Sequence, residues 1–180
     1  NVADVINHDP RVNDMIKVVF IPDYKVSLAE VLIPAADVSI QSSTAGFEAS
    51  GTGNMKFALN GALTVGTYDG ANIEIREAVG ADNFYLFGLR EEQIQEMRKN
   101  NAYNPRACYE NSEYLRRILN AVNSNMFCEK DYVLLFKVIY EELLNRDYYF
   151  LLADLEAFNK ALHDAEKDYT NPQKWAKKAI

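Results

Sequence analysis

Short apolar runs alternate with segments of helical spacing over the first half of the chain. β-rich runs that end at turn residues predict four strands, at residues 17–21, 37–40, 63–66 and 84–87. Helical spacing between them predicts helices at residues 26–32, after Gly53 and after Ala71. This alternation is typical of an α/β fold with a parallel, doubly wound sheet, whose ligands lie beyond the carboxyl ends of the strands.

The second half of the chain is predicted to be mainly helical. Residues 113–122 and 132–144 place apolar side chains at helical spacing with charges between them. Residues 100–105 predict a connecting loop, and Asn171-Pro172 predicts the start of a last helix. We therefore expect one region, residues 1–180, with a sheet part at 1–100 and a helical part at 101–180. The first residues begin inside a helical pattern without Met, and the last helix ends after a few residues, so we interpret the chain as a fragment.

Composition narrows the class of protein only slightly. The chain has 180 residues, 48% of them apolar, which is enough for one sizeable core. A net charge of −7 argues against nonspecific binding to nucleic acid or to an anionic membrane. The sequence predicts neither a membrane span nor a secretory signal, so we expect a cytoplasmic location. Cys108 and Cys128 are too few and too far apart for a zinc site, and no metal is predicted.

The candidate chemistry is concentrated in residues 48–57, Glu-Ala-Ser-Gly-Thr-Gly-Asn-Met-Lys-Phe. Gly51 and Gly53 are both expected to adopt φ > 0 and to turn neighbouring N–H groups toward an anion. The helix that follows would present its amino end to a phosphate. Lys56 lies one turn further along this helix, where its amine can reach another part of the same ligand. Pyridoxal 5′-phosphate has this shape.

The residues alone leave other interpretations open. Lys56 on a helix is most often a solvated lysine, and Glu48 is most often a carboxylate favoured by the helix dipole. The glycines are also compatible with an ordinary strand-to-helix turn. A dinucleotide fingerprint fits poorly, because Lys56 occupies the position of its third glycine.

The run from Ile33-Pro34-Ala35-Ala36-Asp37 to Tyr68-Asp69-Gly70-Ala71-Asn72 resembles the cofactor segment of the α-glucan phosphorylases, which act on glycogen, starch or maltodextrin. The resemblance extends over most of the chain, through Asn7-His8-Asp9-Pro10 and through Tyr169, Asn171-Pro172 and Trp175. It implies part of the Rossmann-like carboxyl-terminal domain of an enzyme with GT-B architecture.

The resemblance also implies roles for individual residues. Lys56 would form the Schiff base with pyridoxal phosphate, and burial is expected to lower its pKa and favour the neutral amine. Gly51, Thr52 and Gly53 would bind the cofactor phosphate. Tyr24 and Lys25 would lie near the cofactor, with Lys25 replacing the usual arginine and losing its bidentate contact. Substrate-binding groups would be Glu48, Ala49, Ser50 and Gly51, which hold the glucosyl unit, and Glu48 and Lys56 would be catalytic.

The implied reaction transfers a terminal glucosyl unit of an α-1,4-glucan to orthophosphate, giving α-glucose 1-phosphate. The family's basic segment for the substrate phosphate and its glucan-binding amino-terminal domain have no counterpart in these residues, so we expect the isolated chain to be inactive. The intact enzyme is expected to be a homodimer. Two alternatives stay open: a non-catalytic α/β anion-binding fragment and a sugar-nucleotide glycosyltransferase of the GT-B type.

Two further groups of residues attract attention but are assigned structural roles. His8 and His163 lack accompanying ligands and are predicted to be structural or surface residues. Residues 147–150, Asp-Tyr-Tyr-Phe, are predicted to pack within a helix and not to form a platform for glucan.

Overall fold

The computed structural model describes residues 2–12, 15–128 and 134–180. The chain divides into two compact units: the first comprises residues 1–24 and 105–148, and the second comprises residues 25–104 and 149–180. Each unit combines segments that are distant in the sequence. The proposed division into a sheet part at 1–100 and a helical part at 101–180 stays a prediction.

The regular elements described in the first unit are all helical. Its helices are α1 (Val2–Asn7), α6 (Pro105–Asn111), α7 (Glu113–Asn123) and α8 (Lys137–Asn145), with the short 3-10 turn η2 (Asn125–Phe127). Leu115 and Leu119 of α7 and Leu144 of α8 are buried, because α6, α7 and α8 pack against one another. The Ser112 hydroxyl caps α7 by accepting a hydrogen bond from the Leu115 N–H. The helix predicted at 113–122 is confirmed. Of the helix predicted at 132–144, residues 132 and 133 lie outside the described residues, residues 134–136 form a turn, and α8 begins at Lys137.

Residues 17–21 do not form the predicted strand. Val19 and Phe20 are exposed, at 66% and 84%. The side chain of Asn7 instead forms hydrogen bonds with both backbone groups of Val18. Its Nδ2 donates to the Val18 carbonyl and its Oδ1 accepts from the Val18 N–H, each at 2.8 Å. Residues 17–21 do have high β propensity. A strand also needs the backbone of a neighbouring strand as its hydrogen-bond partner, and the amide of Asn7 takes that place at Val18.

The second unit is built on a three-stranded parallel sheet of order β1-β2-β3, with strands Val38–Gln41, Leu63–Thr67 and Phe84–Phe87. Ile40 pairs with Val65, which pairs with Tyr85. β2 is buried along its whole length, as expected for a central parallel strand. Apart from residues 17–21, the predicted strands are confirmed, and the α/β fold class is correct.

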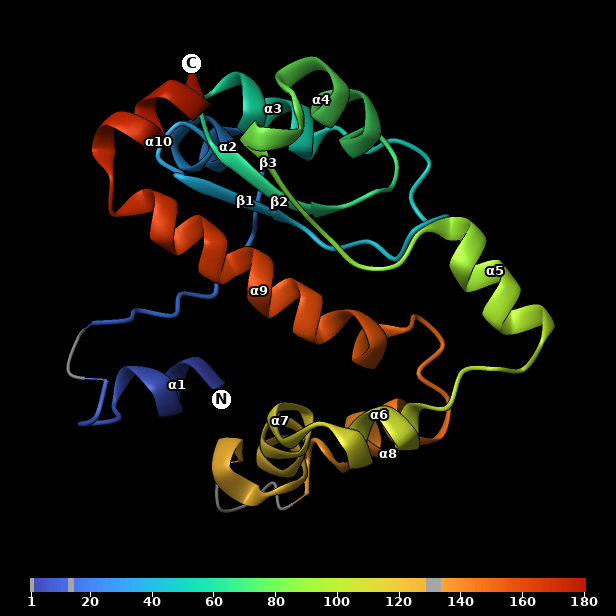
Figure 1. The fold of residues 1–180 in the computed structure, drawn as a ribbon. Coiled ribbons are helices and arrows are strands. Elements are labelled where there is room, and N and C mark those ends of the chain that lie inside the picture. Colours follow the sequence, from blue (N-terminus) through green and yellow to red (C-terminus); the bar gives the residue numbers. More distant parts are fainter. Residues whose placement is uncertain (1, 13–14, 129–133) are drawn as a thin grey trace. The chain divides into compact units, whose positions relative to one another are not determined.

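Helices cover both faces of this sheet (Figure 1). On one face lie α3 (Gly53–Leu59) and α4 (Asn72–Val79), the helices that connect the strands, and on the other lies α9 (Leu151–Tyr169). Val65 and Phe87 pack with Ala161 and Ala165 of α9, and the Phe87 and Phe158 rings are 5.0 Å apart. Burial of these apolar side chains holds the sheet against α9.

The remaining elements complete the edges of the second unit. They are α2 (Val26–Leu32), η1 (Ala81–Asn83), α5 (Glu91–Lys99) and α10 (Pro172–Ala179). The Asn171 Oδ1 accepts a hydrogen bond from the Lys174 N–H, which confirms the predicted start of α10. Residues 100–104 form the predicted loop before α6. Residues 147–150 are not helical, contrary to the prediction: Asp147 and Phe150 have φ of 39° and 57°, and Phe150 stacks on Tyr103 at 4.4 Å.

Candidate functional site

The candidate site is the loop of residues 42–52, which leaves the carboxyl end of β1 and leads into α3. This confirms its predicted place beyond the strand ends. Two threonine hydroxyls fix its first half: Thr67 Oγ1 donates to the Ser43 carbonyl at 2.6 Å, and Thr44 Oγ1 donates to the Tyr149 carbonyl at 2.8 Å. Ala45 is buried with Ile94 and Phe150. The loop therefore leaves the sheet from a rigid base.

Asp69 holds the middle of this loop from the end of the neighbouring strand. Its Oδ1 accepts a hydrogen bond from the Gly46 N–H at 2.8 Å, and its Oδ2 accepts one from the Glu48 N–H at 2.9 Å. The carboxylate is buried, and such hydrogen bonds offset the cost of removing its charge from water. Both oxygens thus bind main-chain groups of the segment that carries Glu48.

The turn that follows is tied to the same neighbouring strand end. The Ala71 N–H donates to the Ser50 carbonyl at 2.9 Å. Gly51 has φ of +76°, as predicted, but Gly53 does not have a positive φ, so that prediction was wrong. Gly53 is the first residue of α3, which requires right-handed helical backbone.

A chain of buried amides fixes the start of α3. Asn54 Nδ2 donates to Asn72 Oδ1 at 2.9 Å, and Asn72 Nδ2 donates to the Thr67 carbonyl at 3.1 Å. Asn54 Oδ1 accepts from the Met55 N–H at 2.9 Å. Neither these amides nor Asp69 had been assigned a role from the sequence, although Asp69-Gly70 directly after a buried strand is a turn signal.

Lys56 stands on the exposed side of α3 and lines a groove between α2 and α3. The groove has a volume of about 360 Å³, and its other lining residues are Val26, Ala29, Glu30, Ile33, Pro34 and Asn60. The predicted burial of Lys56 is wrong for this chain, because no described element packs over that side of α3. Apolar side chains and the carboxylate of Glu30 line the groove together with Lys56.

The other predicted site residues are mostly exposed. Glu48, Ala49, Ser50 and Thr52 lie at the surface, so their polar groups are accessible to a ligand. Lys25 is the residue before α2 and has an extended backbone, while the next residue, Val26, lines the groove. Tyr24 belongs to the first unit and is 62% exposed. The structure thus brings Gly51, Thr52 and Gly53 to the start of the helix that carries Lys56.

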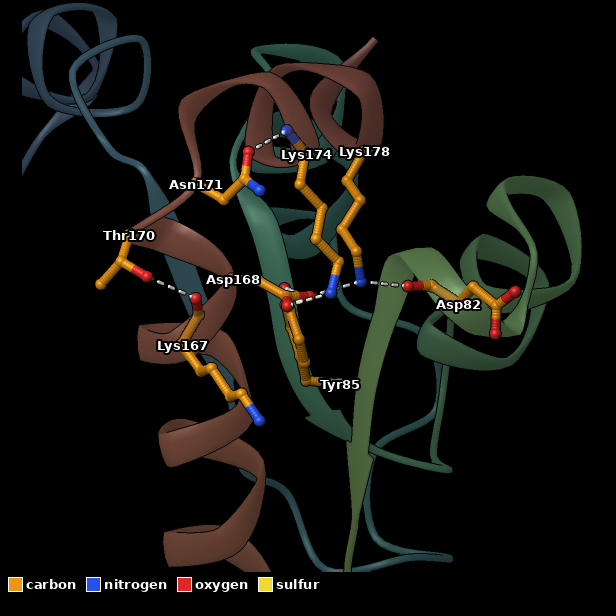
Figure 2. Close-up of polar contacts among 8 residues, drawn as sticks. All are labelled: Asp82, Tyr85, Lys167, Asp168, Thr170, Asn171, Lys174 and Lys178. Atoms are coloured by element: carbon orange, nitrogen blue, oxygen red, sulfur yellow. Dashed lines mark hydrogen bonds and ion pairs between the residues drawn. The ribbon is translucent and has the colours of Figure 1, made fainter.

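A second polar cluster lies near the amino end of β3, away from this loop. Figure 2 shows Lys174 and Lys178 of α10 reaching Asp168 at the end of α9. The Lys178 Nζ is 2.9 Å from Asp168 Oδ2, and the Tyr85 hydroxyl donates to the same oxygen at 2.9 Å. Burial alone would raise the pKa of Asp168, but the hydrogen bonds from Lys174, Lys178 and Tyr85 together hold that pKa well below its ordinary value.

This cluster joins three elements and is assigned a structural role. Lys178 also donates to the Asp82 carbonyl, and its Nζ lies 4.7 Å from the centre of the Tyr85 ring. Burial, and then the neighbouring Asp168 carboxylate, raise the pKa of the Tyr85 hydroxyl, so it stays a hydrogen-bond donor. Sequence analysis did not find the cluster, because Tyr85 lies 83 residues from Asp168 in the chain and only the fold brings β3 to α9 and α10.

The two histidines, which are predicted to be structural or surface residues, contact residues near them in the sequence. His163 is a surface residue 3.5 Å from Glu166, and the Nδ1 of His8 lies 2.7 Å from the Asp4 carbonyl oxygen, which accepts a hydrogen bond from it when Nδ1 carries the proton. No disulfide joins Cys108 and Cys128. Within the described ranges no group of three or more metal-ligating side chains comes together. None of the described helices is long and apolar enough to cross a membrane.

Comparison with known proteins decides the family. A sequence profile described as Carbohydrate phosphorylase matches residues 1–180. The chain belongs to this family. It is 51% identical to glycogen phosphorylase of Chlamydia trachomatis over 181 residues, which is 100% of the chain and 22% of the relative. It is 47% identical to the human brain form of glycogen phosphorylase and 46% identical to glycogen phosphorylase of Synechocystis, in each case over 100% of the chain and 21% of the relative.

Two consequences follow from membership of the carbohydrate phosphorylases. The resemblance inferred from the motif at residues 48–57 is confirmed, and it covers the whole chain. The chain spans about a fifth of the length of the relatives that it matches.

Proposed function

We propose that this chain is the cofactor-bearing segment of an α-glucan phosphorylase that transfers a terminal glucosyl unit to orthophosphate and gives α-D-glucose 1-phosphate. The observation that carries the proposal is the family match over the entire chain, including the motif with Lys56. The match favours this proposal over a non-catalytic anion-binding fragment and over a sugar-nucleotide glycosyltransferase.

The residues around Lys56 fit pyridoxal 5′-phosphate. The Lys56 amine opens on a groove of about 360 Å³, where it can hold the aldehyde carbon of the cofactor. The side chain of Thr52, the residue before α3, makes no capping hydrogen bond, so the N–H groups of Thr52 and Gly53 are available to the phosphate group. Gly51 adopts the positive φ that turns such groups outward. Tyr24 and Lys25 are proposed as further contacts, Lys25 as a single positive charge.

The substrate side of the site is assigned to the loop held by Asp69. Glu48 and the main-chain groups of Ala49, Ser50 and Gly51 would bind hydroxyl groups of the glucosyl unit and fix its orientation. When bound, the cofactor supplies a phosphate group that assists protonation of the departing glucan oxygen. In this proposal Lys56 anchors the cofactor, and the exposed loop orients the sugar.

Labelling of Lys56 tests the proposal. The full-length protein that contains this sequence is incubated with pyridoxal phosphate, reduced with borohydride and mapped by peptide mass. We expect a pyridoxyl group on Lys56. In Lys56→Arg, both this label and the phosphorolysis activity should be lost. The matched control is Lys99→Arg, which changes an exposed lysine in the last turn of α5. Absence of a label on Lys56 in an active enzyme would overturn the proposal.

Three further properties remain predictions for the full-length protein: a homodimer, allosteric control and a cytoplasmic location. Size measurement at several protein concentrations tests the first of these.

A further inference from the structure

The segment of residues 68–72, directly after β2, forms hydrogen bonds with the candidate loop and the start of α3 at three separate places. Asp69 binds the Gly46 and Glu48 N–H groups, Ala71 binds the Ser50 carbonyl, and Asn72 binds Asn54. Each contact reaches a different part of the loop or of the helix after it. We propose that Asp69 is a positioning residue, which sets the place of Glu48 and of the sugar-binding main chain. This inference rests on the proposed function of that loop.

The carboxylate of Asp69 is suited to this task in a way that its amide analogue is not. It offers an acceptor to each of two N–H groups, at 2.8 and 2.9 Å, and the two groups flank Phe47. An asparagine has a single acceptor oxygen, and its amide nitrogen would face an N–H donor. The hydrogen bonds fix the orientation of the Glu48 backbone, and thereby the direction in which its side chain leaves the loop.

Gly70 places the same segment directly against Glu48. With φ of +50°, it comes so close that an added Cβ would lie 2.8 Å from the Ser50 carbonyl oxygen and 3.1 Å from Glu48 Cγ. A side chain at this position would therefore displace the loop without changing any charge. Gly70→Ala and Asp69→Asn disturb the same loop by different means.

The cofactor helix has its own supports, so the two functions can be separated. α3 begins at the Asn54–Asn72–Thr67 chain of hydrogen bonds, in which Asp69 takes no part. Loss of the Asp69 contacts should therefore misplace Glu48 while Lys56 keeps its position. The predicted defect lies in the glucosyl subsite and not in retention of pyridoxal phosphate.

Steady-state kinetics of the full-length enzyme test this inference in the direction of glucan synthesis. In Asp69→Asn and in Gly70→Ala, kcat/KM for glucose 1-phosphate should fall roughly 10- to 100-fold, because a small misplacement of orienting groups has effects of this size. The KM for a maltooligosaccharide acceptor and the pyridoxal content per protomer should stay unchanged.

Two control variants separate positioning from general loss of stability. Asp168→Asn changes another buried carboxylate, at the other end of the sheet (Figure 2). Gly80→Ala places a side chain at φ of +87° with no atom within 4 Å of its Cβ. Both should lower the melting temperature and leave the kinetics of the folded enzyme unchanged.

The outcomes distinguish the two proposals. A wild-type enzyme without pyridoxal on Lys56 would overturn the proposed function. Suppose instead that the wild type carries that label. The positioning role alone would be overturned if Asp69→Asn had wild-type kinetics, or if its loss of kcat/KM equalled the loss in Asp168→Asn. If Asp69→Asn fails to fold, the kinetics of Gly70→Ala decide the question.

Discussion

At the scale of single residues, Gly51 and Gly53 show how one motif combines two backbone requirements. Both were predicted to have φ > 0, because both stand in a turn of the kind that surrounds anions. Only Gly51 does, while Gly53 is helical and has no atom within 4 Å of a Cβ. The sequence shows that both positions are glycine. Only the residue at which the helix begins decides which of the two positions requires a positive φ, and therefore a glycine.

The two glycines should therefore differ in the effect of alanine on folding. Gly51→Ala places a side chain at φ of +76° and should destabilise the protein by about 1 kcal/mol. Gly53→Ala replaces glycine within helical backbone and should stabilise the protein by about 0.5 kcal/mol. Urea denaturation of the two variants measures this difference in the free energy of unfolding. Equal destabilisation by both substitutions would contradict the assigned backbone conformations.

At the scale of elements, local pattern predicted strands best where the sheet buries them. The side chains of β2 and β3 are mostly buried, and the prediction of each strand was confirmed. Residues 17–21 have similar composition, but their Val18 backbone pairs with the Asn7 side chain, so no strand forms. The contact of α9 and α10 with β3 through Asp168 could not be predicted, because it depends on the distance between elements and not on any local pattern.

Asp168 should make the joining of these elements sensitive to acid. Its pKa is lowered in the folded state, so its contribution is complete above the ordinary carboxyl pKa of about 3.9 and is lost as pH falls toward the folded pKa. Asp168→Asn should cost about 2 kcal/mol at neutral pH, since it weakens charged hydrogen bonds and leaves a buried lysine without its counter-ion.

Urea denaturation at pH 7, 5 and 3 checks this expectation. The difference in unfolding free energy between wild type and Asp168→Asn should be the same at pH 7 and 5 and smaller at pH 3. Lys160 forms an exposed ion pair with Asp164 on the same helix, so Asp164→Asn is the matched surface control, with an effect below about 1 kcal/mol. A difference that grows as pH falls would contradict the assigned role of Asp168.

At the scale of the whole molecule, two compact units share the chain, and the loop with Glu48 and the helix with Lys56 both belong to the second. The family match over residues 1–180 agrees with the prediction made from the motif and its flanking residues. The same match shows that these residues amount to about a fifth of the relatives' length.

We expect the isolated 180-residue chain to release no glucose 1-phosphate from glycogen and orthophosphate. The resemblance assigns the basic groups for the substrate phosphate, and the glucan-binding domain, to other parts of the relatives. Positioning and charge stabilisation supply most of the rate enhancement of such a transfer. A coupled assay of glucose 1-phosphate measures the activity, with the full-length enzyme as the positive control. Release by the isolated chain above the background without enzyme would contradict this expectation.

The sequence by itself determined the elements and the chemistry of the motif, because strand burial, helix spacing and residue type are local properties of a chain. Together with the resemblance carried by residues 33–72, it predicted the α/β class, the place of the glycine turn after the end of a strand, and the family. Tertiary structure alone decided that Asp69 holds the Glu48 loop, that amides from two strand ends fix α3, and that Lys56 faces an open groove. The contacts of Asp69 form because parallel strands bring their carboxyl ends together, which joins residues about 20 positions apart in the sequence.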